Sequence, residues 1–142
     1  MKTTEIFKFQ KKKSLKMPLY FSSISAGFPS PADDYIEKTL DLNEYLIKHP
    51  ASTFFLRASG NSMIKAGIQS GDILIIDRSL KPENNNVVVA VVDNEFTVKR
   101  LKIIKKKIFL APENDDLNDI EIKETDDFEI WGVVTSVIHT IL

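Results

Sequence analysis

From residue 53 onward, short apolar runs alternate with turn-forming residues. Such runs, bounded by Gly, Asn and Asp, are typical of β-strands joined in hairpins. The runs cover residues 53–57, 73–76, 87–92, 95–104 and 108–110, and the turn residues between them include Gly71-Asp72, Asn84-Asn85-Asn86, Asp93-Asn94 and Lys105-Lys106-Lys107. Residues 128–142 predict one or two further strands, broken near Gly132. The pattern therefore predicts a mainly β fold with antiparallel hairpins.

The chain before residue 53 follows a different pattern. Residues 1–31 show no sustained periodicity and contain Pro29 and Pro31, which favour extended backbone in the residues before them. Asp41 supplies an N-capping carboxylate to a short periodic stretch that ends at His49-Pro50, which predicts one short helix. We therefore expect an extended, flexible N-terminal arm of residues 1–31 and one folded domain of residues 32–142.

Composition narrows the class of protein. The 142 residues are 43% hydrophobic and 27% charged, an ordinary balance for one globular domain. There is no cysteine, and the two histidines, His49 and His139, stand far apart, so we expect neither a disulfide framework nor a zinc site. The longest apolar run, residues 87–92, is far shorter than a bilayer span. We expect a cytoplasmic protein without a membrane segment.

The net charge of −1 conceals an uneven distribution. The first 26 residues contain six lysines and one glutamate, so their net charge is +5 and that of the remainder is −6. A basic arm can contact nucleic acid phosphates, fold back onto an acidic body, or remain a solvated tail. The arm is too short for the two or three helices of a helix-turn-helix module, so sequence-specific DNA binding is not expected.

Candidate chemistry centres on Ser62, in a turn-like run that begins Ser59-Gly60-Asn61, and on Lys99, in the predicted strand 95–104. A serine hydroxyl needs a base to become a nucleophile, and a neutral lysine can serve. Because the lysine pKa lies near 10.4, neutrality at pH 7 costs about 4.6 kcal/mol, which only apolar burial is expected to supply. Strand alternation places Lys99 on the same face as Thr97, Leu101 and Ile103. The simpler interpretation is a solvated serine and a lysine at a sheet edge.

A third element, Ala26-Gly27, makes the chain resemble the LexA/UmuD family of serine–lysine peptidases, and within it the UmuD-like self-cleaving mutagenesis proteins. The resemblance extends over nearly the whole chain. It rests on Gly27-Phe28-Pro29-Ser30-Pro31-Ala32, Asp41-Leu42-Asn43, His49-Pro50, Ser59-Gly60 with Ser62-Met63, Val92-Asp93, Glu95-Phe96-Thr97-Val98-Lys99 and Gly132-Val133-Val134. Asn84-Asn85-Asn86 departs from the Gly-Asp turn that relatives often have there, although asparagine also tolerates the left-handed backbone conformation.

The resemblance implies a LexA/UmuD-like protease fold of twisted antiparallel sheets. It implies that Ser62 is the nucleophile, that Lys99 is the general base, and that the backbone amides of Asn61 and Ser62 form the oxyanion hole. Met63 and Ile64 would pack behind the nucleophile. The bond to be cleaved would be Ala26-Gly27, and neither a cofactor nor a metal is implied.

The resemblance also implies partners and a role. The protein would form a homodimer, and a RecA filament on single-stranded DNA would act as co-protease. The shortened form, residues 27–142, would serve as accessory subunit of a UmuC-like error-prone DNA polymerase in SOS translesion synthesis. Two alternatives stay open: a non-catalytic polymerase accessory with an inactive dyad, and a LexA-type repressor without its DNA-binding domain.

Overall fold

The structure is a computed structural model that describes residues 2–8, 14–20 and 36–142. The chain divides into two compact units, a larger one within residues 1–9 and 49–142 and a smaller one within residues 10–48. No helix in these described segments is long and apolar enough to cross a membrane.

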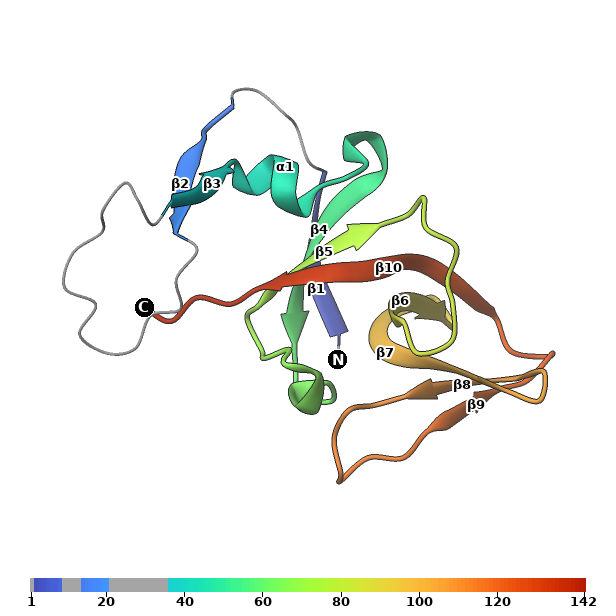
Figure 1. The fold of residues 1–142 in the computed structure, drawn as a ribbon. Helices are drawn as coiled ribbons and strands as arrows, with labels where there is room; N and C mark the ends of the chain where they lie inside the picture. Colours follow the sequence, from blue (N-terminus) through green and yellow to red (C-terminus); the bar gives the residue numbers. More distant parts are fainter. Residues whose placement is uncertain (1, 9–13, 21–35) are drawn as a thin grey trace. The chain divides into compact units, whose positions relative to one another are not determined.

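The larger unit is built on one antiparallel eight-stranded sheet (Figure 1). Its strands, in sheet order, are β1 (Lys2–Lys8), β4 (Thr53–Ser59), β5 (Ile73–Asp77), β10 (Phe128–Ile138), β6 (Val87–Val92), β7 (Glu95–Ile104), β8 (Lys107–Ala111) and β9 (Ile120–Ile122). The prediction of a mainly β, antiparallel fold is confirmed. The hydrophobic pattern predicts neither β1 nor β9.

Two tight turns connect β6, β7 and β8 into a meander. Asp93 and Asn94 have φ of 49° and 67°, and Lys105 and Lys106 have φ of 49° and 66°. Positive φ at both central residues is the mark of type I′ turns, whose twist matches that of the flanking strands. Asn85, before β6, also has a positive φ, of 76°, which the asparagine run allows. The meander makes β7 an inner strand, paired with β6 on one side and β8 on the other.

The C-terminal segment forms the single long strand β10, which pairs with β5 on one side and β6 on the other. The predicted break near Gly132 is a register shift between Ile130 and Gly132 and not an end of the strand. A Cβ atom at Gly132 would lie 2.4 Å from the Ile76 side chain, so a glycine lets the two strands approach closely here.

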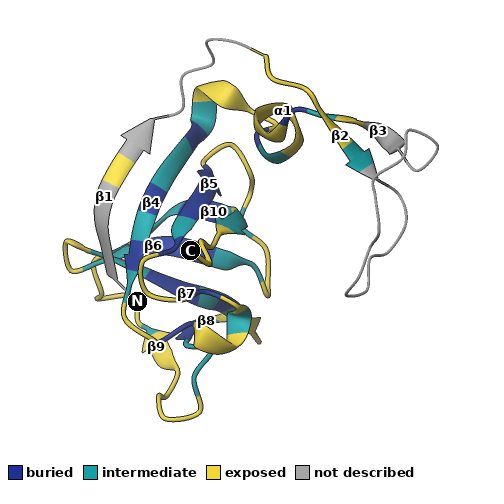
Figure 2. Ribbon diagram, turned by 90° about the vertical axis from the view of Figure 1, so that its left-hand side faces the viewer, coloured by how far each residue is buried: buried dark blue, intermediate teal, exposed yellow. Residues whose placement is uncertain are grey.

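Two buried clusters form the core. Figure 2 shows buried residues along β4, β5 and β7. The first cluster joins β4, β5, β6 and β7 to the segment after β4, through Leu56, Ala58, Met63, Ile68, Leu74, Ile76, Val89 and Val98. The second joins β6, β7, β8 and β10, through Val88, Ala90, Leu101, Leu110 and Val133. Each cluster contains residues of β6 and β7, so the strand that carries Lys99 contributes to both.

The smaller unit contains a two-stranded antiparallel sheet of β2 (Met17–Tyr20) and β3 (Ile36–Leu40), followed by the helix α1 (Leu42–Leu46). The Asp41 carboxylate accepts a hydrogen bond from Asn43 N at 2.9 Å, so the predicted helix and its cap are confirmed. The other carboxylate oxygen accepts from Ser14 Oγ at 2.9 Å and Leu15 N at 2.8 Å, and these bonds lower the pKa of Asp41. The predicted boundary after residue 31 lies outside the described residues, as does the Ala26-Gly27 bond.

Candidate active site

Ser62 and Lys99 meet in the larger unit. Lys99 Nζ lies 3.1 Å from Ser62 Oγ, within hydrogen-bond distance, although the two residues are separated by 36 others along the chain. Both are buried, with exposed fractions of 7% for Ser62 and 8% for Lys99. The burial shields the two side chains from most of the surrounding water, so they differ from a solvated pair at the surface.

A tight turn after β4 presents Ser62. Gly60 has φ of 92°, a left-handed conformation that glycine adopts without penalty and that lets the chain leave β4 sharply. Met63 is fully buried in the first core cluster and anchors the residue after Ser62. Ile64, which was expected to pack there as well, begins the 3₁₀-helix Ile64–Ala66 and is half-exposed. Of the two residues, only Met63 packs behind the turn, because Ile64 is directed outward.

Lys99 lies at the middle of β7, opposite Val88 of β6. Its amine contacts three uncharged oxygens: Ser62 Oγ at 3.1 Å, Thr97 Oγ1 at 3.0 Å and Val98 O at 3.2 Å. Desolvation by burial penalises the ammonium form and lowers the pKa of Lys99 below its ordinary range. The neutral amine, the form that can accept a proton, is therefore reached at a lower pH than in a solvated lysine.

Thr97 contacts the amine of Lys99, and the sequence pattern alone predicts no role for this threonine. Strand alternation places Thr97 and Lys99 on the same face of β7, and the structure shows the threonine hydroxyl in hydrogen-bond contact with Nζ. A hydroxyl side chain two residues before a buried strand lysine is the only signal in the sequence that could have indicated this contact.

A cavity of about 250 Å³ adjoins the amine. Thr97 and Lys99 line one part of it, Val92, Leu110 and Ile120 provide apolar walls, and Asp93 and Glu95 complete the lining. A space that is mostly apolar and is bordered by a buried amine suits a short stretch of extended polypeptide with a small or aliphatic side chain.

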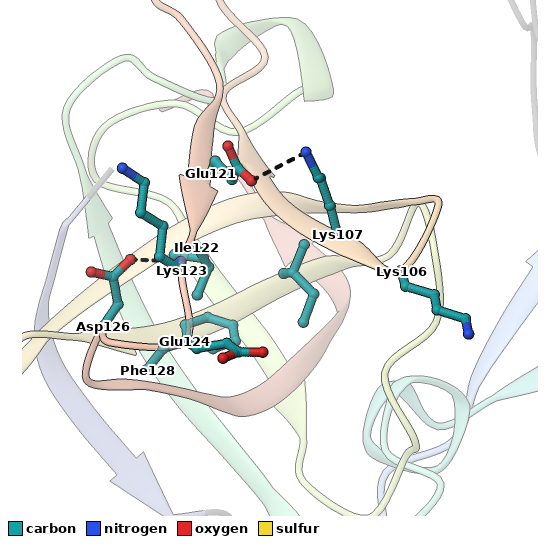
Figure 3. A pocket seen from close by; sticks show the side chains of 9 residues that line it. Lys106, Lys107, Glu121, Ile122, Lys123, Glu124, Asp126 and Phe128 are labelled. Atoms are coloured by element: carbon teal, nitrogen blue, oxygen red, sulfur yellow. Dashed lines mark hydrogen bonds and ion pairs between the residues drawn. The ribbon is translucent and has the colours of Figure 1, made fainter.

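A second cavity, of about 540 Å³, lies at the other end of the β8–β9 hairpin and contains neither Ser62 nor Lys99 (Figure 3). Three of its charged side chains have partners: Lys107 Nζ lies 4.0 Å from Glu121, and Asp126 accepts a hydrogen bond from Lys123 N at 2.8 Å. Figure 3 shows Lys107 and Glu121 pointing toward each other. This cavity lacks the nucleophile and base that distinguish the Ser62 site.

The two histidines occupy opposite ends of β5. His49 Nδ1 lies 2.5 Å from Asp77, the last residue of β5, and His139 Nδ1 lies 2.6 Å from Asp72, just before β5. The first pair joins the segment before β4 to the end of β5, and the second joins the residue after β10 to the segment before β5. In the described part of the chain, no group of three His, Cys, Asp or Glu residues could hold a metal ion.

The other predicted site residues fall in two places. Asn61 and Ser62, whose amides are the predicted oxyanion donors, directly follow Gly60 in the turn, and the carbonyl of Asn61 accepts hydrogen bonds from Asn114 Nδ2 at 2.9 Å and Ile64 N at 3.3 Å. Ala26 and Gly27, the predicted cleavage site, lie outside the described residues.

The chain is similar to known proteins over most of its length. The family model described as Peptidase S24-like matches residues 18–135. The chain is 50% identical over 122 residues to Protein ImpA of Salmonella typhimurium, a match that covers 86% of this chain and 83% of ImpA. It is 48% identical over 120 residues to Protein MucA of Escherichia coli, covering 84% of this chain and 82% of MucA. It is also 39% identical to the LexA repressor of Glaesserella parasuis, covering 87% of this chain and 59% of that repressor.

Proposed function

The chain belongs to the peptidase S24-like family, and we propose that it is a UmuD-like, self-cleaving serine peptidase in which Ser62 is the nucleophile and Lys99 the general base. The observation that carries the proposal is the 3.1 Å contact between Lys99 Nζ and Ser62 Oγ inside a buried site. A serine–lysine pair needs this contact for proton transfer and needs the burial for a neutral amine.

The contacts of Nζ allow a neutral amine as well as an ammonium, whose three N–H groups could donate to the same three oxygens. The neutral amine is the form that a general base requires. Such an amine has one lone pair and two N–H groups, and Nζ has three oxygen neighbours. If the lone pair accepts the Ser62 hydroxyl proton, the two N–H groups can donate to Thr97 Oγ1 and Val98 O. The remaining contacts would then hold the lone pair toward Ser62, which is the orientation that a general base requires.

The proposed reaction is hydrolysis of the Ala26-Gly27 bond. Ser62 Oγ attacks the carbonyl carbon of Ala26 while its proton passes to Lys99, and the oxyanion that forms is stabilised by the amides of Asn61 and Ser62. The Lys99 ammonium then protonates the departing Gly27 nitrogen, which leaves an ester between Ser62 and Ala26. Water, deprotonated by Lys99, hydrolyses the ester and restores Ser62 with release of the Ala26 carboxylate.

The substrate segment suits the site. Residues 23–29 contain small residues at 26 and 27, which permit close approach to a nucleophile, and an extended conformation places Ile24 on the same side as Ala26. The apolar walls of the cavity beside Lys99, formed by Val92, Leu110 and Ile120, match an aliphatic side chain in size and polarity. The same segment of either protomer in a homodimer meets these requirements.

The biological role follows the UmuD-like resemblance, which the high identity to ImpA and MucA supports. In this role the chain cleaves itself slowly until a RecA filament on single-stranded DNA stimulates the cleavage. The shortened form, residues 27–142, then assists a UmuC-like DNA polymerase in error-prone lesion bypass in the cytoplasm. This makes the protein an SOS mutagenesis factor whose activity depends on its own proteolysis.

The test is self-cleavage of the purified full-length chain. One arm of the experiment raises the pH to about 10, where a larger fraction of Lys99 is neutral, and the other adds RecA, ATP and single-stranded DNA at neutral pH. Mass spectrometry is expected to find a fragment that begins at Gly27 in both arms. Ser62→Ala and Lys99→Ala should abolish it, whereas the matched controls Ser59→Ala and Lys102→Ala should retain it.

Two results contradict the proposal. One is the absence of any fragment that begins at Gly27 from the unaltered chain under both conditions, which would favour a non-catalytic accessory protein. The other is the undiminished appearance of that fragment from Ser62→Ala or Lys99→Ala, which would assign the cleavage to other residues or to a contaminating protease.

A further inference from the structure

The turn that presents Ser62 is bound to a loop from a distant part of the chain. This loop, residues 112–116, follows β8 and is called loop 112–116. Glu113 N donates a hydrogen bond to Ser62 O at 2.7 Å, and Lys65 N donates to Glu113 O at 2.9 Å. The two bonds run in opposite directions between the same two segments, so they fix the position of the turn along the loop as well as its distance from it.

A side chain connects the same loop to the strand of the base. The Glu113 carboxylate accepts from Arg100 Nε at 2.5 Å, and Arg100 directly follows Lys99 on β7. Both side chains of this ion pair are partly buried, which weakens screening by solvent and salt. Glu113 therefore contacts the turn of the nucleophile through its backbone and the strand of the base through its side chain.

Asn114 makes two contacts that fix its amide group. Its Nδ2 donates to Asn61 O at 2.9 Å, and its Oδ1 accepts from Asp116 N at 2.9 Å. Because a carbonyl oxygen can only accept and a backbone N–H can only donate, one orientation of the amide satisfies both contacts and the flipped orientation satisfies neither. The donor of Asn114 is thus directed at the peptide bond between Asn61 and Ser62.

That peptide bond carries the Ser62 N–H. A trans peptide unit is planar, and its C=O and N–H point in opposite directions. A hydrogen bond that holds Asn61 O therefore also holds the direction of the Ser62 N–H. The turn itself supplies a second bond to Asn61 O from Ile64 N, at 3.3 Å, which is longer than the 2.9 Å bond from Asn114.

We propose that Asn114 is a positioning residue of the peptidase: its amide holds the Asn61–Ser62 peptide so that the Ser62 N–H is directed at the oxyanion of the tetrahedral intermediate. The inference rests on the proposed function, because only acyl transfer creates an oxyanion beside Ser62. It assigns to loop 112–116 a role in the rate of the chemical step that is separate from the basicity of Lys99.

The deciding variant is Asn114→Asp in the full-length chain. Aspartate keeps the oxygen that accepts from Asp116 N but replaces the donor with a carboxylate oxygen that repels Asn61 O. The first-order rate of self-cleavage is measured from about pH 7 to about pH 11. The profile gives a limiting rate at high pH and a midpoint pH, which reports the pKa of the general base. Loss of an oxyanion donor costs about a hundredfold to a thousandfold in rate, so loss of its orientation should lower the limiting rate about tenfold to a hundredfold.

The matched control is Asn118→Asp, which is the same chemical change at an exposed position four residues further on. Like most surface substitutions, it should have little effect and leave the limiting rate within about twofold of that of the unaltered chain. The midpoint is measured in Asn114→Ala, which removes the donor without adding a charge that would raise the pKa of Lys99, and it should not move there because the contacts of Lys99 are unchanged. A general loosening of the fold would also disturb the buried amine and shift that midpoint. If Asn114→Asp is unfolded at the assay temperature by circular dichroism, Asn114→Ala replaces it under the same criteria.

The outcomes separate this inference from the proposed function. If the unaltered chain cleaves and Ser62→Ala does not, but the Asn114 variant retains the full limiting rate, the positioning role is wrong and the dyad stands. If Asn114→Ala is slow only because its midpoint has moved, Asn114 acts through Lys99 and the inference is again overturned. If the unaltered chain does not cleave at all, it is the proposed function that fails.

Discussion

A buried lysine can act as a base only where the fold makes its charged form unfavourable. Lys99 is 8% exposed, and its amine contacts two hydroxyls and a backbone carbonyl, which can hydrogen-bond to a neutral amine as well as to an ammonium. Burial lowers the pKa of this amine, whereas a partner carboxylate would have raised it. Because folding lowers the pKa of Lys99, the protonation of this amine is linked to the stability of the folded protein.

That link predicts how stability depends on pH. In the unfolded chain the Lys99 amine keeps its proton up to about pH 10.4, whereas in the folded chain its pKa is lower. The unfolded state thus binds more protons between the two pKa values, and the free energy of unfolding rises with pH through that window. Each unit of difference between the two pKa values contributes about 1.36 kcal/mol.

The measurement compares Ser62→Ala with Ser62→Ala/Lys99→Met, because removal of Ser62 prevents self-cleavage. Urea unfolding at several pH values from about 7 to about 10 should show that the chain with Lys99 gains stability relative to the chain with methionine as the pH rises. Ser62→Ala/Lys102→Met controls for the loss of a lysine from the other face of β7. A constant difference over this range would mean that burial does not lower the Lys99 pKa.

At the scale of elements, the strands with the clearest turn signals were the ones that the sequence could predict. Asp93-Asn94 and Lys105-Lys106 are central residues of tight turns, and the strands beside them lie where the pattern places them. β9 could not be predicted because its three residues are too few to show alternation and their side chains remain mostly exposed. β1 was missed because residues 2–8 lack the alternating apolar pattern of a strand with one buried face.

Gly132 gives a prediction at the same scale. A Cβ at this position would lie 2.4 Å from Ile76 Cγ2 and 3.3 Å from Arg78 Cγ, so Gly132→Ala forces β5 and β10 apart. Overpacking of this kind costs about 1–3 kcal/mol, which outweighs the small gain from replacing a strand glycine. Urea unfolding in the Ser62→Ala background should show a loss of this size, whereas Glu129→Ala, at an exposed position of the same strand, should change stability little. Equal stability of the two variants would contradict the close approach.

At the scale of the whole molecule, the sequence indicated which residues to consider but not that they meet. Ser62 follows β4 and Lys99 lies on β7, and in the sheet β5, β10 and β6 separate these two strands. The contact therefore requires the sheet to curve and the turn after β4 to reach β7, and both depend on pairings between distant segments that a local pattern does not encode. Thr97 and Asn114 were missed for a related reason, because the contacts that give them meaning are set by tertiary structure.

The position of β1 gives a prediction for the whole protein. β1 precedes the proposed cleavage site and pairs with β4, which follows that site, so hydrolysis of the Ala26-Gly27 bond cuts the covalent connection between the two strands. β1 pairs in the sheet with β4 alone and otherwise lies close to β7, and a short edge strand of this kind is weakly bound once it belongs to a separate peptide. β1 should therefore leave the sheet after cleavage, and β4 should become the edge strand.

Hydrogen exchange resolved by NMR would detect this change. Ala58 N donates to Asp72 O and Ala58 O accepts from Gly71 N, both toward β5, so strand alternation directs the amides of Phe55, Arg57 and Ser59 toward β1. These three amides should exchange faster in the cleaved protein, after its peptide has been removed by gel filtration, than in intact Ser62→Ala. The amides of β5 should be unchanged, since β4 and β10 still flank that strand. Unchanged exchange in β4 would mean that β1 does not protect this edge before cleavage, whereas faster exchange would show that proteolysis uncovers a strand edge able to pair with another chain.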